Sequence, residues 1–293
     1  MNQEQIKEML KPSIQGIDRC PVGQFIPSDW KEPEGYIYKK FEVEGIPVEH
    51  LMPKEKKTDK VVIQLHGGGY ILALIDAYRD GAIGYSQIAG GAEVFTIDYR
   101  VAPTHLYPSA LEDVVKVYKW IIDQGYDSDK IIIVGDSAGG NLALATTLYL
   151  KDQKIKLPKL VIAISPWADI EGGTPSREAN KDKDLILGSQ GFSMSSELIK
   201  PTYMAEANLK SPYVSPIHGD YSGFPNLLIQ VGSYEVLLDD AVNVAKKAKE
   251  AGVTVRQSTY EGMSHVFQLL LPTLEKSQAA WGEIAEVIQE TFA

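Results

Sequence analysis

This 293-residue sequence lacks several features that would place it in particular classes of protein. Cys20 is the only cysteine, so the chain has no intrachain disulfide. No apolar run reaches the ~18 residues that a membrane-spanning helix needs. The first residues contain no basic stretch followed by an apolar one, so they do not resemble a signal peptide. We therefore expect a cytoplasmic protein that does not use a membrane.

Basic residues are also scarce, with 29 Lys and Arg against 39 Asp and Glu and a formal net charge of −10. Nucleic-acid binding needs clustered Lys and Arg to neutralise phosphates, so we expect no nucleic-acid partner. No P-loop or dinucleotide-binding glycine pattern occurs, and no pair of histidines has the spacing of metal ligands. The sequence therefore predicts neither a nucleotide site nor a metal site.

The sequence does contain a regular alternation of short apolar runs and longer helical patterns. The apolar runs, rich in β-branched residues, occupy 60–65, 93–98, 130–135, 159–165, 226–232 and 253–259. The helical stretches cover roughly 79–90, 108–124, 138–152, 238–251 and 275–291. Continuous apolar strands are buried on both faces, which predicts an α/β fold with a parallel sheet covered by helices. Two alternating segments, 36–43 and 46–53, predict a hairpin at one edge of this sheet.

Two segments interrupt this alternation. Residues 1–35 contain several prolines, yet apolar residues recur there at helical spacing and predict an amphipathic helix that packs on the body. Residues 172–210 form a long excursion between two core strands, polar at first and helical from about Ser193. We expect 1–35 and 172–210 to contribute a cap or lid, and 36–171 with 211–293 to form the α/β core.

A serine stands where one of the apolar runs turns into a helix. The run at 130–135 leads into GDSAG at 135–139, and a helical stretch follows at once. A G-x-S-x-G sequence between a strand and a helix describes a nucleophile elbow, a sharp turn that exposes the serine hydroxyl above the sheet. On this motif alone, Ser137 is either a nucleophile or an ordinary helix N-cap.

A second glycine-rich turn, HGGG at 66–69, follows the apolar run at 60–65. Consecutive glycines let backbone N–H groups converge on one point because no side chains stand in the way. Such a loop forms part of the oxyanion hole of esterases. We expect the amides of Gly67, Gly68 and Ala138 to stabilise a carbonyl oxygen that becomes an anion. The two motifs together favour the nucleophile for Ser137.

A serine nucleophile needs a general base, and the base needs a carboxylate that orients it. Of the five histidines, only His218 and His265 follow the serine, as the chain order of this kind of site requires. His265 lies in a loop between the run at 253–259 and the last helical stretch. His218 precedes the run at 226–232 and would lie at the wrong edge of the sheet. The sequence therefore predicts His265 as the base.

Three acidic residues follow the run at 226–232 and compete for the role of the carboxylate. Glu235 lies in the loop at the carboxyl end of that strand, where active sites of open α/β sheets collect. Asp239 and Asp240 fall where the next helix begins, and carboxylates there commonly stabilise the helix dipole. We predict a triad of Ser137, His265 and Glu235, with Asp239 as the alternative acid.

Taken together, these motifs resemble the bacterial hormone-sensitive-lipase-type (family IV) carboxylesterases of the α/β-hydrolase superfamily. The resemblance is carried by HGGGY at 66–70, DYRVAPTHLYPSALEDV at 98–114, GDSAGGNLA at 135–143, SPWAD at 165–169, VGSYEVLLDD at 231–240 and GMSHVF at 262–267. These segments span most of the chain from about residue 60. The family usually has Asp where Glu235 stands, although some of its members resemble this sequence in using Glu.

The resemblance implies an α/β-hydrolase fold, with a mostly parallel eight-stranded sheet flanked by helices and a small helical cap. It also implies that a serine carboxylesterase hydrolyses short- to medium-chain acyl esters of small molecules through an acyl-enzyme, without a cofactor. Dimers through the last strand and helix are frequent in the family, so a homodimer is an expected partner. For the substrate pocket we expect Trp167, Phe192, Tyr203 and Val266.

Two other functions stay open at this point. An amidase or peptidase would use the same triad, and no feature of the sequence excludes amide substrates. A ligand-binding protein on a hydrolase scaffold is the other alternative, because a fold does not fix a function. Relatives of that kind lack a complete triad, whereas all three members are present here.

Overall fold

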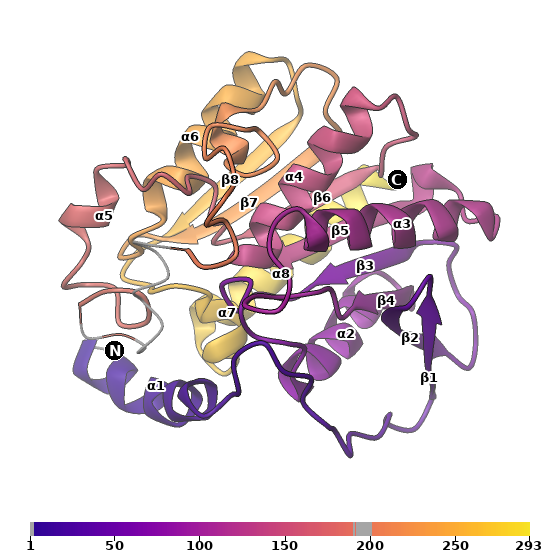
Figure 1. Ribbon diagram of the computed structural model, residues 1–293. Coiled ribbons are helices and arrows are strands. Elements are labelled where there is room, and N and C mark those ends of the chain that lie inside the picture. The colour runs from indigo at the N-terminus through magenta and orange to yellow at the C-terminus, as the bar shows by residue number, and fades with distance from the viewer. Residues whose placement is uncertain (1–2, 190, 192–200) are drawn as a thin grey trace.

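The centre of the protein is one mixed sheet with helices on both faces (Figure 1). The computed structural model describes residues 3–189, 191 and 201–293. The eight strands are in the order β1-β2-β4-β3-β5-β6-β7-β8. Their bounds are β1 (Tyr36–Val43), β2 (Ile46–Pro53), β3 (Val61–Leu65), β4 (Glu93–Ile97), β5 (Ile131–Asp136), β6 (Leu160–Ile164), β7 (Asn226–Gly232) and β8 (Val255–Tyr260).

The hairpin of β1 and β2 forms one edge of the sheet, as predicted. β1 pairs with β2 and β2 with β4 in antiparallel fashion, whereas the neighbours from β4 to β8 are all parallel. The carboxyl ends of the parallel strands therefore meet at one edge, and the loops that leave them lie side by side. The predicted mostly parallel eight-stranded sheet is confirmed.

Helices cover the sheet because its central strands are apolar on both faces. The helices are α1 (Gln3–Asp18), α2 (Asp76–Ile88), α3 (Ser109–Asp123), α4 (Ala138–Asp152), α5 (Ser176–Ala179), α6 (Leu238–Glu250), α7 (Phe267–Leu270) and α8 (Glu275–Thr291), with the short 3-10 helices η1 (Ser128–Lys130) and η3 (Pro216–His218). Alternate residues of β5 belong to different cores. Ile131 and Ile133 pack with α3, α4 and α6, while Ile132 and Val134 pack with α2 and α8.

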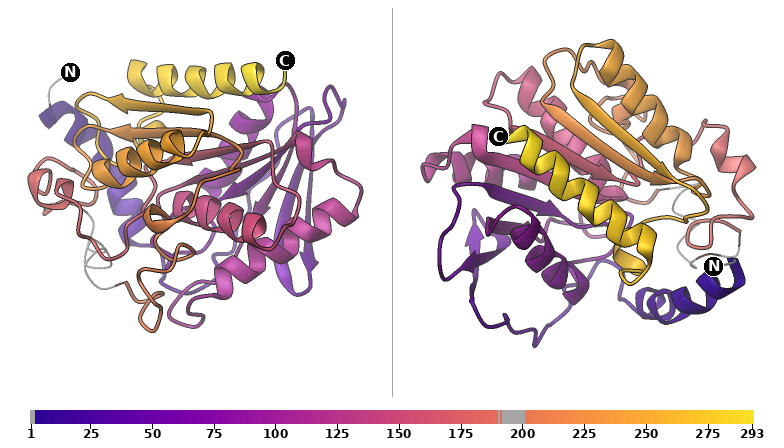
Figure 2. Two further views of the ribbon diagram at one scale, coloured as in Figure 1. Left: turned by 90° about the horizontal axis from the view of Figure 1, so that it is seen from above. Right: turned by 180° about the vertical axis from the view of Figure 1, so that it is seen from behind.

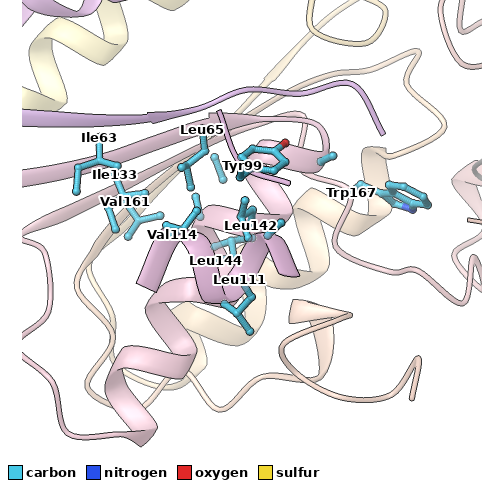
Figure 3. Close-up of a cluster of buried hydrophobic side chains, with 14 of the residues drawn as sticks. Ile63, Leu65, Tyr99, Leu111, Val114, Ile133, Leu142, Leu144, Val161 and Trp167 are labelled. Atoms are coloured by element: carbon cyan, nitrogen blue, oxygen red, sulfur yellow. The ribbon is translucent and has the colours of Figure 1, made fainter. Parts of the chain in front are cut away.

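The two faces are visible in the figures. Figure 2 shows α8 lying across the face opposite α4 and α6. Figure 3 shows the first core, in which Leu142 and Leu144 of α4 approach Ile63, Ile133 and other strand residues. Burial on both sides holds β3, β5 and β6 rigidly, which fixes the positions of the loops that follow them.

The predicted N-terminal helix is present as α1. It buries Ile6 and Leu10 in a small core with Ile186, Met263 and Phe267. This core joins α1 to the excursion at 172–210 and to the chain around α7. The first part of the excursion at 172–210, which the sequence marked only as polar, contains the short helix α5. The helix predicted from about Ser193 begins outside the described residues, and its described part, 201–210, forms turns and not a helix. Within the described ranges, no helix has the length and apolar character needed to span a membrane.

Candidate active site

Ser137 lies at the turn between β5 and α4 with φ 54° and ψ −118°. A positive φ is strained for a residue with a side chain and persists only where the surroundings enforce it. Glycines make the tight turn possible: a Cβ at Gly135 would lie 2.2 Å from the Gly139 oxygen, and one at Gly139 would lie 2.2 Å from the Leu65 oxygen. Although Ser137 occupies the N-cap position of α4, its side chain makes no capping hydrogen bond. The geometry is that of a nucleophile elbow.

His265 and Glu235 meet above the same edge of the sheet. His265 lies between β8 and α7, Glu235 lies between β7 and α6, and Nδ1 of the ring is 3.0 Å from Oε2 of the carboxylate. Glu235 is fully buried, and burial raises the pKa of its carboxyl while the hydrogen bond with His265 opposes that shift. A carboxylate on Nδ1 fixes the ring tautomer and leaves the Nε2 lone pair to accept a proton.

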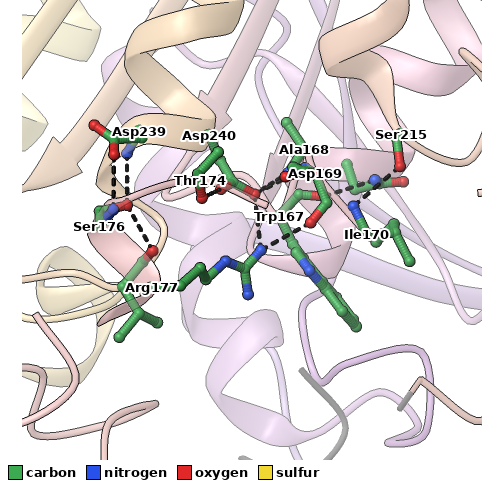
Figure 4. A network of polar contacts seen from close by, with 12 residues as sticks. Trp167, Ala168, Asp169, Ile170, Thr174, Ser176, Arg177, Ser215, Asp239 and Asp240 are labelled. Carbon is green, nitrogen blue, oxygen red and sulfur yellow. Dashed lines mark hydrogen bonds and ion pairs between the residues drawn. The ribbon is translucent and has the colours of Figure 1, made fainter. Parts of the chain in front are cut away.

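The two other acidic candidates face elsewhere. Asp239 accepts a hydrogen bond from the Ser176 amide at 2.7 Å. Asp240 forms an ion pair with Arg177 at 3.1 Å and accepts hydrogen bonds from two backbone amides after β6 (Figure 4). Burial raises the pKa of the Asp240 carboxyl to about 6, and the charge of Arg177 opposes this shift. These residues fasten the chain after β6 to α6, so Glu235 is the one of the three that lies beside the histidine.

Ser165, directly after β6, contacts the predicted acid and was not among the residues predicted for the site. Its hydroxyl donates to Glu235 Oε1 at 2.7 Å and accepts from the Val266 amide at 3.2 Å. The Gly232 amide also donates to Oε1, at 2.5 Å. Ser165 has φ 47°, so its backbone is strained as well. It joins the loop that carries the acid to the loop that carries the base. The SPWAD segment at 165–169 contributed to the family resemblance, but the serine in it does not by itself indicate a role.

Replacing Ser165 with alanine is expected to lower kcat by about tenfold, because Glu235 would lose a hydrogen bond to its charged form. The fold should be kept, since a hydroxyl alone is removed. The measurement is kcat and KM on a p-nitrophenyl ester, with Ser165→Thr as the variant that restores a hydroxyl. An unchanged kcat in Ser165→Ala would show that the bridge has no influence on the reaction.

One of the predicted oxyanion donors, the Gly67 amide, is already hydrogen-bonded within the protein. The Gly67 amide donates to the Tyr78 hydroxyl at 2.7 Å, so its proton is already engaged and is not directed at a substrate. Gly68 and Gly69 have φ of 107° and 62°, which glycine adopts without strain. Within the described residues, the amides of Gly68, Gly69 and Ala138 have no hydrogen-bond partner. The unpaired amides of this loop therefore lie one residue further along than predicted.

His66 is buried beneath the loop and shapes it. Its Nδ1 lies 2.8 Å from the Gly67 oxygen, and its ring stacks on Tyr99 with centroids 4.1 Å apart. Burial lowers the pKa of the His66 imidazole, which favours the neutral ring. This position agrees with a structural role for His66 and not with one as a proton carrier.

Asp136, the residue before the serine, is a buried carboxylate. Burial raises its pKa to about 6, and a hydrogen bond from Tyr78 partly opposes this shift. The folded protein therefore binds this proton more tightly than the unfolded chain does. The stability that this group contributes is greatest below its ordinary pKa of 3.8 and is lost as the pH rises through about 6.

The variant Asp136→Asn is expected to stabilise the protein more at pH 8 than at pH 5, by about 1 kcal/mol, because the amide carries no charge to bury. Urea unfolding of both proteins at the two pH values measures this difference. An equal effect at both pH values would contradict the raised pKa of Asp136.

Ser137 and His265 line a cavity of about 440 Å³. This volume is typical of a site for a small molecule. Trp167 and Val266 of the predicted pocket also line it, together with the glycine loop. Further apolar walls come from Ile17, Leu72, Ile75, Ile186, Leu187 and Leu270.

Of the other two predicted pocket residues, the structure describes only Tyr203. Tyr203 lies outside the lining of this cavity: its ring stacks on Tyr70 at 4.5 Å, and its hydroxyl accepts from the Ala110 amide at 2.7 Å. Aromatic packing and a satisfied hydroxyl make it part of the core. Phe192 lies outside the described residues.

A separate group of side chains has the chemistry of metal ligands. Asp169, Glu171 and His218 place one ligand atom each within 4.8 Å of one another, in the described part of the chain. Ordinary pairing explains this proximity, since His218 and Lys210 each lie 3.9 Å from Glu171 and the Gly173 amide donates to Asp169. We assign no function to this group.

Comparisons with known proteins show which family the chain resembles. A family model described as the α/β hydrolase fold matches residues 62–269. An acetyl-hydrolase of Streptomyces hygroscopicus is 35% identical over 225 residues, which cover 77% of this chain and 74% of the relative. An esterase of Acinetobacter venetianus is 33% identical over 244 residues, covering 83% and 78%.

Solved structures show the same likeness over the whole chain. The crystal structure of an esterase from the bacterial hormone-sensitive lipase family has a TM-score of 0.85 at 29% identity and covers 100% of both chains. A crystal structure of EstE5 soaked with p-nitrophenyl butyrate has a TM-score of 0.82 at 31% identity and covers 97% of this chain and 98% of that one.

The chain belongs to the α/β-hydrolase fold family and, within it, to the bacterial hormone-sensitive-lipase type of esterase. Its enzyme class is that of a carboxylic ester hydrolase.

Proposed function

We propose that this protein hydrolyses carboxylic esters of small molecules with Ser137 as nucleophile, His265 as base and Glu235 as the orienting acid. The observation that carries the proposal is the 3.0 Å contact between His265 Nδ1 and Glu235 Oε2. It is made at the wall of the cavity that also holds the strained Ser137. A base that is oriented in this way and shares a cavity with a serine is the arrangement that acyl transfer requires.

In the proposed reaction, Ser137 Oγ attacks the ester carbonyl carbon while His265 Nε2 takes the hydroxyl proton. The resulting oxyanion accepts hydrogen bonds from Gly68, Gly69 and Ala138, whose amides lack partners among the described residues. The Ala138 amide stands at the positive end of α4, which adds to this stabilisation. The imidazolium then protonates the departing alkoxide. Water repeats the sequence on the acyl-enzyme and releases the acid.

The cavity supports short- to medium-chain acyl esters as substrates. Its volume of about 440 Å³ and largely apolar walls suit a small acyl group and a small alcohol. The likeness to a structure soaked with p-nitrophenyl butyrate supports the same class. We further propose that 1–35 and 172–210 act as a cap, because Ile17 of α1 and Ile186 and Leu187 of the excursion line the cavity.

The test is a series of p-nitrophenyl esters from acetate to dodecanoate, with butyryl p-nitroanilide as the matched amide. We expect turnover to peak between acetate and hexanoate and to exceed turnover of the anilide. Faster cleavage of the anilide would favour the amidase alternative. No turnover of any ester by the pure protein would favour a ligand-binding protein.

We expect the reaction to need no cofactor. Dimerisation and a cytoplasmic location remain predictions.

A further inference from the structure

We propose that Tyr78 and Asp136 are positioning residues that hold the glycine loop so that the Gly68 and Gly69 amides face the reacting carbonyl. This inference rests on the function proposed above, in which those amides bind the oxyanion. Neither residue belongs to the proposed triad, and neither donates to the substrate. They act through the backbone of Gly67.

A continuous chain of hydrogen bonds links the glycine loop to the strand that carries the nucleophile. The Gly67 amide donates to Tyr78 Oη at 2.7 Å, and Tyr78 Oη donates to Asp136 Oδ2 at 3.0 Å. Asp136 is the last residue of β5 and directly precedes Ser137. Tyr78 comes from α2, which is a separate element. The chain therefore ties both halves of the proposed site to one point.

The identity of residue 67 is explained by this contact. Unlike Gly68 and Gly69, Gly67 does not have a positive φ, so backbone conformation does not demand glycine here. A Cβ at this position would lie 2.4 Å from Asp136 Oδ2 and 2.9 Å from Tyr78 Oη. Glycine is needed because the Asp136 carboxylate and the Tyr78 hydroxyl occupy the space that a Cβ would take. We call these two side chains the strut, and the first glycine of the motif leaves room for it.

The strut and His66 together fix the direction of the next amide through peptide geometry. In a trans peptide the C=O and the following N–H point to opposite sides. His66 Nδ1 holds the Gly67 oxygen at 2.8 Å, which directs the Gly68 N–H away from His66. Tyr78 holds the preceding N–H, so both peptides that flank Gly67 are fixed. Without the hydrogen bond to Tyr78, the 66–67 peptide could rotate. That rotation would change the direction of the Gly68 N–H, because glycine has wide conformational freedom.

Asp136 contributes by positioning Tyr78 and not by its charge, because it lines the cavity in which the oxyanion would form. A buried carboxylate beside a developing oxyanion opposes it, because like charges repel strongly where water is excluded. Its hydrogen bond with Tyr78 fixes the hydroxyl proton on the carboxylate side, so the hydroxyl oxygen presents a lone pair to the Gly67 amide. Asp136 therefore sets the role of Tyr78 as acceptor.

The first test is Tyr78→Phe, which removes the hydroxyl and keeps the ring. We expect kcat on p-nitrophenyl butyrate to fall about 10- to 100-fold with KM changed less than about twofold, because the amides are misaimed and not removed. Affinity for an alkyl trifluoromethyl ketone, whose serine adduct carries the oxyanion, should fall by the same factor as kcat. The matched control is Tyr85→Phe, a buried tyrosine on the same helix, which should keep its kcat.

The second test compares Asp136→Ala with Asp136→Asn, and it stands even where Tyr78→Phe does not fold. Asparagine keeps an oxygen that accepts from Tyr78, so it should retain most of the kcat that alanine loses. Adding Tyr78→Phe to Asp136→Ala should cost little more, because both changes break one chain. An unchanged kcat in Tyr78→Phe, a loss confined to KM, or equal losses in alanine and asparagine would each overturn the proposal. Failure of the proposed function itself would show separately, as full activity in Ser137→Ala.

Discussion

Replacing Ser137 with alanine is expected to lower kcat on p-nitrophenyl butyrate by about 10⁴- to 10⁶-fold. The residual rate would come from the oxyanion donors and from binding alone, as in other serine hydrolases that lose the nucleophile. Alanine keeps the Cβ, so the strain of the positive φ remains, and only Oγ, which makes no capping hydrogen bond, is lost. The stability of the variant should therefore be close to that of the parent. The measurement is steady-state kinetics together with thermal unfolding of both proteins.

A control shows that the effect belongs to this serine and not to any serine of the protein. Ser222→Ala changes an exposed serine that does not line the cavity and should leave kcat unchanged. An activity of Ser137→Ala within tenfold of the parent would mean that another residue attacks the ester.

The variant Glu235→Gln is expected to lower kcat by about 10³- to 10⁴-fold. Glutamine keeps the shape of the side chain but offers His265 Nδ1 either an amide donor or an uncharged oxygen, so the tautomer and the imidazolium lose their support. KM should change far less than kcat, because Glu235 is buried behind the histidine and does not line the cavity.

The matched control for this experiment is Asp239→Asn, which changes the alternative acid by the same replacement. Its oxygen can still accept from the Ser176 amide, so activity should stay close to that of the parent protein. A large loss in Asp239→Asn with a small one in Glu235→Gln would transfer the role of the acid.

Much of the fold could be predicted from the sequence because its strands and helices carry strong periodic signals. The helical pattern at 138–152 coincides with α4, and that at 275–291 coincides with α8. The short helix α5 was not predicted, because four residues carry no periodicity and its stability comes from contacts such as that of Ser176 with Asp239 of α6.

The predicted triad followed from local context, since a strand end before each residue fixes where its side chain emerges. His265 and Glu235 lie on neighbouring loops because β7 and β8 are adjacent parallel strands. The sequence did not show which glycine amide is paired. That depends on Tyr78, which lies on another element and belongs to no motif considered.

Tyr203 was misplaced for a related reason. An apolar aromatic residue after a long excursion suits a pocket wall and a core equally well, and composition does not separate the two. It is buried and stacks on Tyr70, a residue of the HGGGY segment. The contacts of Ser165 with Glu235 and Val266 could not be predicted, because a single serine after a strand forms no recognisable motif.

The central claim is that Ser137 is the nucleophile, and covalent labelling tests it most directly. An alkyl fluorophosphonate should modify the protein once, and peptide mapping by mass spectrometry should place the adduct on Ser137. Ser137→Ala should take up no label, and Glu235→Gln should react much more slowly than the parent protein. A label on any other residue, or full labelling of Ser137→Ala, would contradict this account.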